Sequence, residues 1–368
     1  MTVLTEELLL RIRARAAGYD HENAFFFEDL DELREAGYLA PRSLLETARD
    51  QRMLAAYAPA TALAINMHLV WVGVARVLKD RGDDSLQWVL DDAASGELFA
   101  FGNSEQGNDL VLWDSLTTAD TVEGGYAFTG TKIFTSLSPA WTRLGIFGKH
   151  SGEQGDRLIH GFITRDTPGW HAKDDWDTLG MRATQSQSTV LDGAFVPDAR
   201  VARILPVGPS ADPFIFGIFS NFLLLIGSVY AGIADRALEL AVESVKRRTS
   251  LKTGQTYDKD PDFRWRIADA ALALDALAPQ LETLARDVDS LADHGADWFR
   301  LLTGAKHRAT ETARYVVDQA MRSAGGGGYR SASELARLQR DVLAGIYHPS
   351  DTESVHATVA ANLLGPLS

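Results

Sequence analysis

The hydrophobic pattern of this 368-residue chain changes its period twice, and these two changes constrain the fold more than any other feature. Up to about residue 96, apolar residues recur at three- and four-residue spacing, which predicts helices. Between residues 97 and 205 they form short β-branched and aromatic runs joined by Gly, Asn, Asp and Ser, which predicts strands. From residue 206 to 368 the helical period returns. The chain therefore predicts an α+β protein with an N-terminal α-helical domain (1–96), a central β-domain (97–205) and a C-terminal four-helix bundle (206–368).

The predicted strands are short and have no helices between them, which favours an antiparallel barrel or sandwich. They are Leu98–Gly102, Leu110–Thr118, Tyr126–Phe134, Leu144–Gly148, Leu158–Thr164 and Thr189–Val196. The predicted helices are Thr5–Arg15, Leu30–Ala36, Leu44–Tyr57, Ala60–Lys79, Ser85–Ala94, Phe214–Thr249, Phe263–Asp293, Gly295–Ala324 and Ser333–Tyr347.

Composition excludes several classes of function. A net charge of −14 argues against nucleic-acid binding. The apolar run Phe214–Val229 is too short to span a bilayer and is interpreted as a core helix, so no membrane association is expected. With no cysteine and no N-terminal signal pattern, we expect a cytoplasmic protein without disulfides or a metal site. No GxGxxG follows a strand and no GxxxxGK occurs, which disfavours Rossmann and P-loop folds.

Three polar segments adjoin the predicted strands. Gly180–Ser188 is rich in hydroxyls and amides and leads into a strand that Pro197 ends, and Gly102–Asp109 lies between two strands. Phe134 and Ser136 end a third strand, and in an extended chain their side chains would share one face. Such a pair can stack on a ring while donating to its edge. Each segment is either part of a ligand site or an ordinary surface connection.

Two further segments offer contacts for an anion. Residues 322–329 read Arg-Ser-Ala-Gly-Gly-Gly-Gly-Tyr, and consecutive glycines can present backbone N–H groups to a phosphate or form a hinge. The basic run Lys246–Ser250 ends a predicted helix, where it is either a second anion contact or a C-terminal cap. His68 interrupts an apolar helix and is either a core residue or a site residue.

These motifs together resemble the acyl-CoA dehydrogenase superfamily over nearly the whole chain. The motifs are the domain order, the loop Gly102–Asp109 before a strand, Thr129-Gly-Thr-Lys132, Leu179-Gly-Met-Arg182, and Gly325–Tyr329 followed eleven residues later by Arg340-Asp341. The resemblance implies an enzyme that binds FAD, or FMN, between the β-domain and the bundle, and that assembles as a homotetramer or homodimer.

The resemblance also implies roles for individual residues. Phe134 would stack near the flavin ring, Ser136 would donate at its reactive nitrogen edge, and the backbone around Gly102 and Ser104 would line the pyrimidine side. The pyrophosphate contacts would be Arg248 and Ser250, together with Gly325 and Gly326 from a neighbouring subunit, and Arg322 replaces the usual glutamine there.

The sequence departs from the dehydrogenases where their glutamate base would lie. The matching segment, Ile346–His356, is two residues longer and places His348 or Ser350 in the base position, with Asp351 beside them. The other position known for the base matches Phe222. Gly102-Asn103-Ser104 also stands where dehydrogenases carry Thr-Glu-Pro.

These changes are similar to the monooxygenase branch of the superfamily, in which histidines matching His68 and His348 line the substrate pocket and a hydroxyl like Ser136 contacts the reduced-flavin–O2 adduct, a C4a-hydroperoxide. The sequence therefore leans towards monooxygenation of a small organic substrate, with a flavin reductase as partner. The alternative is dehydrogenation of an acyl-CoA, with His348 or Asp351 as base and electron-transfer flavoprotein as partner. A non-catalytic assembly protein is a third interpretation, but Ser136, Arg248 and the glycines are all retained.

Overall fold

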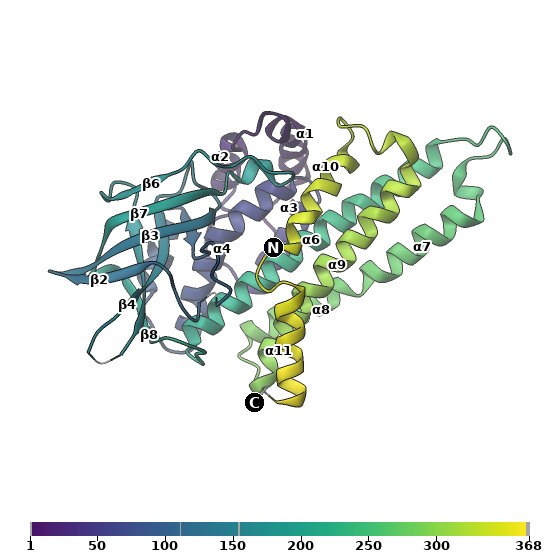
Figure 1. Ribbon diagram of the computed structural model, residues 1–368. Helices are drawn as coiled ribbons and strands as arrows, with labels where there is room; N and C mark the ends of the chain where they lie inside the picture. The colour runs from purple at the N-terminus through teal and green to yellow at the C-terminus, as the bar shows by residue number, and fades with distance from the viewer. Residues whose placement is uncertain (1, 111, 154, 366–368) are drawn as a thin grey trace.

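The computed structural model describes residues 2–110, 112–153 and 155–365, and shows helices, then strands, then helices (Figure 1). The last N-terminal helix ends at Ala94, the first strand begins at Phe99, and the C-terminal helices begin at Pro213. The predicted fold class is confirmed. The N-terminal helices are α1 (Glu6–Glu22), α2 (Phe27–Glu35), α3 (Leu44–Ala55), α4 (Pro59–Asp80) and α5 (Gln87–Ala94).

Eight strands of the described chain form one sheet in the order β6-β7-β3-β2-β4-β5-β8, with β1 beside β4. Most neighbours are antiparallel, as predicted, but β4 pairs in parallel with β1 and with the first residue of β2. Parallel neighbours need a crossover connection, and here β2 and β3 supply it between β1 and β4. The strands are β1 (Phe99–Gly102), β2 (Thr118–Val122), β3 (Gly125–Thr135), β4 (Arg143–His150), β5 (Arg157–Thr164), β6 (Trp170–Ala172), β7 (Gln187–Pro197) and β8 (Val201–Pro206).

The predicted strand Leu110–Thr118 is wrong for its described residues up to Thr117, because the chain turns there, and only Thr118 belongs to a strand, β2. The amides of Trp113 and Asp114 both donate to the carbonyl of Leu110, and Leu112 has φ +68°. Val111 lies outside the described residues. The prediction also missed β6, β8 and, apart from Thr118, β2.

The C-terminal helices pack along one another beside the sheet (Figure 1). The predicted helix Phe263–Asp293 is divided in two after Asp275, because Pro279 has no amide to donate to the Asp275 carbonyl and its ring would clash with that carbonyl in a continuous helix. The predicted helix Ser333–Tyr347 becomes an α-helix followed by a 3₁₀ turn, Val342–Ile346, and α11 was not predicted. The helices are α6 (Pro213–Arg247), α7 (Pro261–Asp275), α8 (Leu277–Asp289), α9 (Trp298–Ala324), α10 (Glu334–Asp341) and α11 (Thr352–Leu364).

Two helices, α4 and α6, form the centre of the molecule. Both are long and apolar enough to cross a membrane by length and composition, but 94% and 83% of their apolar windows are buried inside the protein. They are core helices, as the sequence predicted for α6. Gly73 of α4 allows this close packing, because a Cβ there would lie 1.9 Å from Oδ1 of Asn221 on α6.

Trp71 fixes α4 against the sheet. Its indole Nε1 donates to the carbonyl of Ala100 on β1 at 2.9 Å, and its ring lies where a Cβ of Gly145 on β4 would be. The end of β1, and therefore the loop that follows it, is held at a defined position beside the helices.

Candidate functional site

A tight turn at the end of β3 presents the two residues singled out in the sequence. Phe134 has φ +58°, and its carbonyl accepts from the amide of Ser136 at 2.9 Å. The Phe134 side chain is 54% exposed and meets the Trp176 ring edge-on, whereas Ser136 is only 7% exposed. The expectation that both share the face of an extended strand is therefore wrong. The turn leaves one aromatic face free and a buried hydroxyl behind it.

The loop after β1 lies next to this turn. Ser104 forms a bridge with Ile133, whose amide donates to the carbonyl of Ser104 at 2.8 Å. Asn103 is 2% exposed, and neither Oδ1 nor Nδ2 has a partner among the described residues. An unpaired buried amide is costly, so a ligand edge with one donor and one acceptor would satisfy it. The structure thus brings together Gly102, Ser104, Phe134 and Ser136, which lie far apart in the sequence.

A buried carboxylate fixes this loop from behind. Glu105 accepts from Lys132 Nζ at 2.7 Å, and from Ser115 and Thr117. The Glu105 and Lys132 side chains are 1% and 0% exposed. The sequence reasoning missed this pair, although a lysine inside an apolar strand was a usable signal.

A second turn, Thr184–Ser186, holds the Ser136 turn in place. The amides of Leu137 and Ser138 donate to the carbonyls of Thr184 and Gln185. The hydroxyl oxygens of Ser136 and Ser186 lie 2.7 Å apart. The polar loop and the strand end predicted from sequence are therefore one structural unit.

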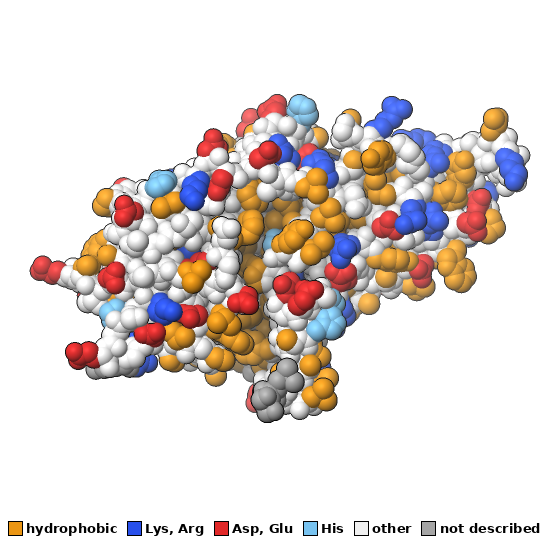
Figure 2. Space-filling view, viewed as in Figure 1, with side chains coloured by type: hydrophobic (Ala, Val, Ile, Leu, Met, Phe, Trp, Pro, Cys, Tyr) orange, Lys and Arg blue, Asp and Glu red, His pale blue; other side chains and the backbone are white. Residues whose placement is uncertain are grey.

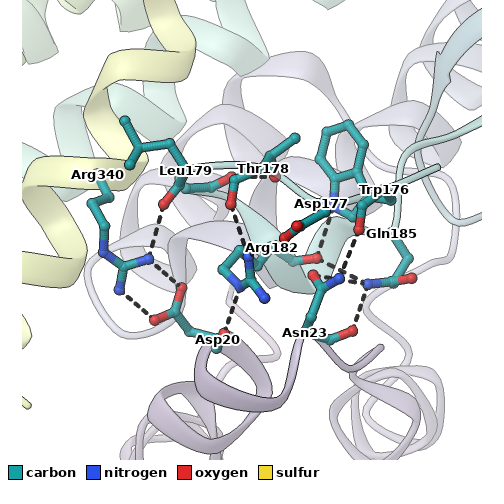
Figure 3. A network of polar contacts seen from close by, with 10 residues as sticks. Asp20, Asn23, Trp176, Asp177, Thr178, Leu179, Arg182, Gln185 and Arg340 are labelled. Carbon is teal, nitrogen blue, oxygen red and sulfur yellow. Dashed lines mark hydrogen bonds and ion pairs between the residues drawn. The ribbon is translucent and has the colours of Figure 1, made fainter. Parts of the chain in front are cut away.

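A polar network anchors the loop Trp176–Gln185 between α1 and α10 (Figure 3). Arg182 donates to the carbonyl of Asp20 at 2.8 Å, and Arg340 forms an ion pair with the Asp20 carboxylate. Gln185 Nε2 donates to the carbonyl of Asn23, the left-handed C-cap of α1, at 2.7 Å (Figure 3). Two segments distant in sequence, the end of α1 and α10, thus fix the loop that carries Thr184 and Ser186.

His68 does not lie in an accessible site. It is fully buried, its Nε2 donates to the carbonyl of Leu39 at 2.8 Å, and its Nδ1 accepts from the amide of Phe99 at 3.2 Å. Burial lowers the pKa of His68 to about 4, so the ring is neutral. Both ring nitrogens form hydrogen bonds with backbone groups. We therefore correct the predicted substrate-pocket role of His68 to a structural role.

His348 lies against the bundle with its Nδ1 3.3 Å from the hydroxyl of Tyr230. Burial and the nearby Lys306 ammonium lower the pKa of His348. If Nδ1 accepts from Tyr230, Nε2 carries the proton and donates; in the other tautomer Nε2 is free to act as a base. The half-buried imidazole is therefore neutral, and its Nε2 can donate a hydrogen bond to a substrate in one tautomer or accept a proton from it in the other.

Lys306 holds the chain around His348, a role that no motif in the sequence predicted. Its ammonium donates to the carbonyls of Gly345, His348 and Ser350 at 3.2, 2.8 and 2.8 Å. Lys306 is 1% exposed.

Asp351 is the N-cap of α11. Its Oδ1 accepts from the amide of Ser354 at 2.9 Å and from the Ser354 hydroxyl. These bonds lower the pKa of Asp351. A weakly basic capping carboxylate is a poor proton acceptor, so we correct its predicted role to that of a helix cap.

The predicted pyrophosphate contacts gather at the far end of α6. Arg248 Nη1 donates to the carbonyl of Ser323 at 2.7 Å, and Gly325, with φ +64°, lies against the same guanidinium. Ser250 lies in the following hairpin, Gly326 is exposed, and Arg322 is exposed and paired with Asp318. Arg248 and Gly325 therefore belong to one group.

This group is remote from the Phe134 turn of its own chain. Phe222 stacks on Phe101, the residue before Gly102, with ring centroids 6.1 Å apart. From Phe222 to Arg248 the helix rises on the order of 40 Å, which is longer than a flavin nucleotide. The two groups can serve one flavin only if the Arg248 group comes from another copy of the chain.

The residues around Phe134 fit a flat ring with a polar edge. Phe134 offers a face, Asn103 an unpaired amide, and Ser136 a hydroxyl. Figure 2 shows that the surface is hollowed between the strands and the C-terminal helices, with hydrophobic side chains in the recess. An isoalloxazine ring combines an apolar face with donor and acceptor groups along one edge, so this donor set suits a flavin.

The chain is similar to known proteins along nearly its whole length. The family model for the acyl-CoA dehydrogenase C-terminal domain matches residues 224–350. The Bacillus subtilis protein YdbM, named provisionally as an acyl-CoA dehydrogenase, is 27% identical over 360 residues, covering 94% of this chain and 92% of that protein. The amino sugar nitrososynthase DnmZ of Streptomyces peucetius is 30% identical over 236 residues, covering 62% of this chain and 56% of DnmZ.

One solved structure is similar over nearly the full length. KijD3 in complex with FMN and dTDP-3-amino-2,3,6-trideoxy-4-keto-3-methyl-D-glucose superposes with a TM-score of 0.87 at 25% identity, covering 98% of this chain and 92% of KijD3.

Proposed function

We propose that this protein catalyses a monooxygenase reaction. It belongs to the acyl-CoA dehydrogenase superfamily and is a flavin-dependent oxidoreductase. The family model, the relatives and KijD3 confirm the predicted resemblance, fold and cofactor class. In the proposed reaction one atom of O2 is added to a small organic substrate and the other leaves as water. Reduced flavin supplies the two electrons and two protons and is returned oxidised.

The observation that carries the proposal is the lack of a free carboxylate at either position of the dehydrogenase base. Phe222 occupies one position and stacks on Phe101. The other holds His348 or Ser350, and the carboxylate beside them, Asp351, caps α11. Removal of a proton from a weak carbon acid depends on a positioned base that contributes about 10²- to 10⁴-fold. Oxygen transfer has no such requirement.

The relatives support an amine as the acceptor of oxygen. DnmZ is named as an amino sugar nitrososynthase, and KijD3 was solved with an amino sugar nucleotide. Formation of a nitroso group from an amine requires the addition of oxygen to nitrogen. We extend this to the present chain as a proposal, with a neutral His348 as a group able to accept a proton from, or donate a hydrogen bond to, the substrate nitrogen.

Acyl-CoA dehydrogenation is the second candidate. The similarity to YdbM over almost the whole chain favours it, as does the tautomer of His348 that leaves Nε2 free. In this reaction His348 would take the proton next to the thioester carbonyl, and a bound oxidised flavin would supply the hydride acceptor. The electrons then leave to an electron-transfer flavoprotein, whereas the monooxygenase needs a flavin reductase.

An anaerobic experiment separates the two reactions. Butyryl-CoA is added to the oxidised, flavin-loaded protein without oxygen, and the flavin colour is followed. We expect no bleaching. In a second experiment, photoreduced protein is mixed with air-saturated buffer, and we expect a transient absorbance distinct from that of oxidised and of reduced flavin. Bleaching by butyryl-CoA would replace the monooxygenase proposal with the dehydrogenase one.

Assembly belongs to the same proposal. Because Arg248 and Gly325 lie far from Phe134 of their own chain, we propose that a second copy brings them to the flavin, in a homodimer or homotetramer. Sedimentation equilibrium of the flavin-loaded protein tests this, and a monomer that holds flavin tightly would contradict it.

A further inference from the structure

Three hydroxyl groups form a buried chain that ends at the proposed flavin site. The oxygens of Thr184 and Ser186 lie 2.7 Å apart, and those of Ser186 and Ser136 also lie 2.7 Å apart. The three residues are 0%, 5% and 7% exposed. Among the described residues, these hydroxyls have no other hydrogen-bond partner. Both separations are typical of O–H···O hydrogen bonds.

The direction of the two hydrogen bonds follows from the burial of Thr184. Three hydroxyls carry three protons, and two bonds within the chain use two of them. If Ser136 donated to Ser186, and Ser186 to Thr184, the third proton would remain on Thr184, for which the described part of the chain offers no acceptor. A buried donor without an acceptor costs roughly 1–3 kcal/mol. The favoured direction therefore runs from Thr184 to Ser186 to Ser136.

This direction leaves the unused proton on Ser136, beside the exposed ring of Phe134. We propose that Thr184 and Ser186 are positioning residues that keep Ser136 as a hydrogen-bond donor towards the flavin. Ser186 occupies an acceptor site of the Ser136 oxygen, so a flavin bound at this turn would be the acceptor of the remaining Ser136 proton. This inference rests on the proposed function, because it requires a flavin at this turn.

The backbone fixes the geometry of the hydroxyl chain. The amides of Leu137 and Ser138 donate to the carbonyls of Thr184 and Gln185, so the two turns cannot separate without breaking further bonds. Gln185 is tied to Asn23 at the end of α1 (Figure 3). Because the oxygens are held in place, loss of one hydroxyl is not repaired by a shift of its neighbours.

A donor aimed at oxidised flavin stabilises the oxidised form more than the reduced form, in which the reactive nitrogen itself carries a proton. Loss of the donor should therefore raise the flavin reduction potential. In the variants Ser186→Ala and Ser136→Ala we expect the ratio of reduced to oxidised flavin at a fixed potential to rise about tenfold. For a two-electron couple this corresponds to about 30 mV. The double variant should shift no further than either single variant, because both changes interrupt one chain.

The control is Ser138→Ala. Ser138 is 2% exposed, lies in the same turn, and donates from its hydroxyl to the carbonyl of Thr135 at 2.7 Å, but it is not part of the hydroxyl chain. Its removal should lower the melting temperature about as much as Ser186→Ala and leave the potential unchanged. Ser186→Thr, which retains a hydroxyl, should restore the parent potential.

The experiment titrates the FMN- or FAD-loaded parent and variants with a redox indicator dye and records melting curves beside the potentials. A higher potential in Ser186→Ala and Ser136→Ala, with parent values in Ser138→Ala and Ser186→Thr, supports the inference. A Ser186→Ala protein that binds flavin with the parent potential would overturn the inference and leave the proposed function standing. A parent protein that binds no flavin would overturn both.

Discussion

Replacement of Lys306 with methionine tests how the segment that carries His348 is held. The buried ammonium donates to three carbonyls, at 2.8, 2.8 and 3.2 Å. Burial lowers the pKa of Lys306 to about 8, so the charged form prevails at pH 7. Charge-assisted hydrogen bonds contribute about 1.5–3 kcal/mol each, and burial of the ammonium costs several kcal/mol in return. Methionine fills a similar volume without either effect, so we expect a net loss of about 3 kcal/mol.

Hydrogen exchange measured by mass spectrometry localises this loss. A cost of ~3 kcal/mol corresponds to roughly a hundredfold increase in local opening, so amides within residues 345–351 should exchange about that much faster. Lys149→Met is the matched control, because Lys149 is partly exposed and pairs with Asp114 at 2.9 Å. Pairs of that kind contribute ~0–1 kcal/mol, so its exchange pattern should stay close to that of the parent. Unchanged exchange of residues 345–351 in the Lys306→Met protein would refute the reasoning.

Three other changes give distinct outcomes. The pKa of His68 is about 4 in the folded protein and 6.5 in the unfolded chain. Between pH 6.5 and pH 4, the imidazole is therefore protonated in the unfolded chain but not in the folded protein. The unfolding free energy should thus fall by about 1.4 kcal/mol per pH unit from about pH 6.5 to 4, and urea titrations at several pH values should find this component missing in His68→Gln. Lys132→Met leaves Glu105 buried without its cation, so urea titrations should show a loss of about 3–5 kcal/mol in unfolding free energy. Adding Glu105→Gln to the Lys132→Met protein should partly reverse this loss. Equal stability of the Lys132→Met protein and the parent would contradict the ion-pair argument. Arg340→Ala breaks the ion pair with Asp20 and should make the loop before Gln185 more sensitive to limited proteolysis, with no new cleavage as the contrary result.

The order of the domains was predictable because each rests on local periodicity. Long helices such as α4 and α6 repeat the three- and four-residue apolar spacing many times, so this local pattern alone is enough to predict them. Short elements gave a weaker signal. Strand β6 is only three residues long, and the apolar run after Leu110 resembles a strand although a positive φ at Leu112 turns the chain.

The candidate site was predictable only in part. The sequence identified Phe134, Ser136 and the loop at Gly102, and the structure brings them together. The turn that places the Phe134 ring outside and the Ser136 hydroxyl inside was not predictable, because it depends on a left-handed backbone residue rather than on strand alternation. Spacing also could not show that both nitrogens of His68 bond to backbone groups, since Leu39 and Phe99 lie on other segments.

The measurement that tests the central claim most directly is a fluorescence titration of the apoprotein with FMN and with FAD. We predict saturation at about one flavin per chain for at least one of the two. Phe134→Ala should weaken this binding about tenfold, as loss of a stacking aromatic does, whereas Leu272→Ala, which removes an exposed apolar side chain from α7, should not. A folded protein that takes up neither flavin, or one whose binding is indifferent to Phe134→Ala, would contradict the account.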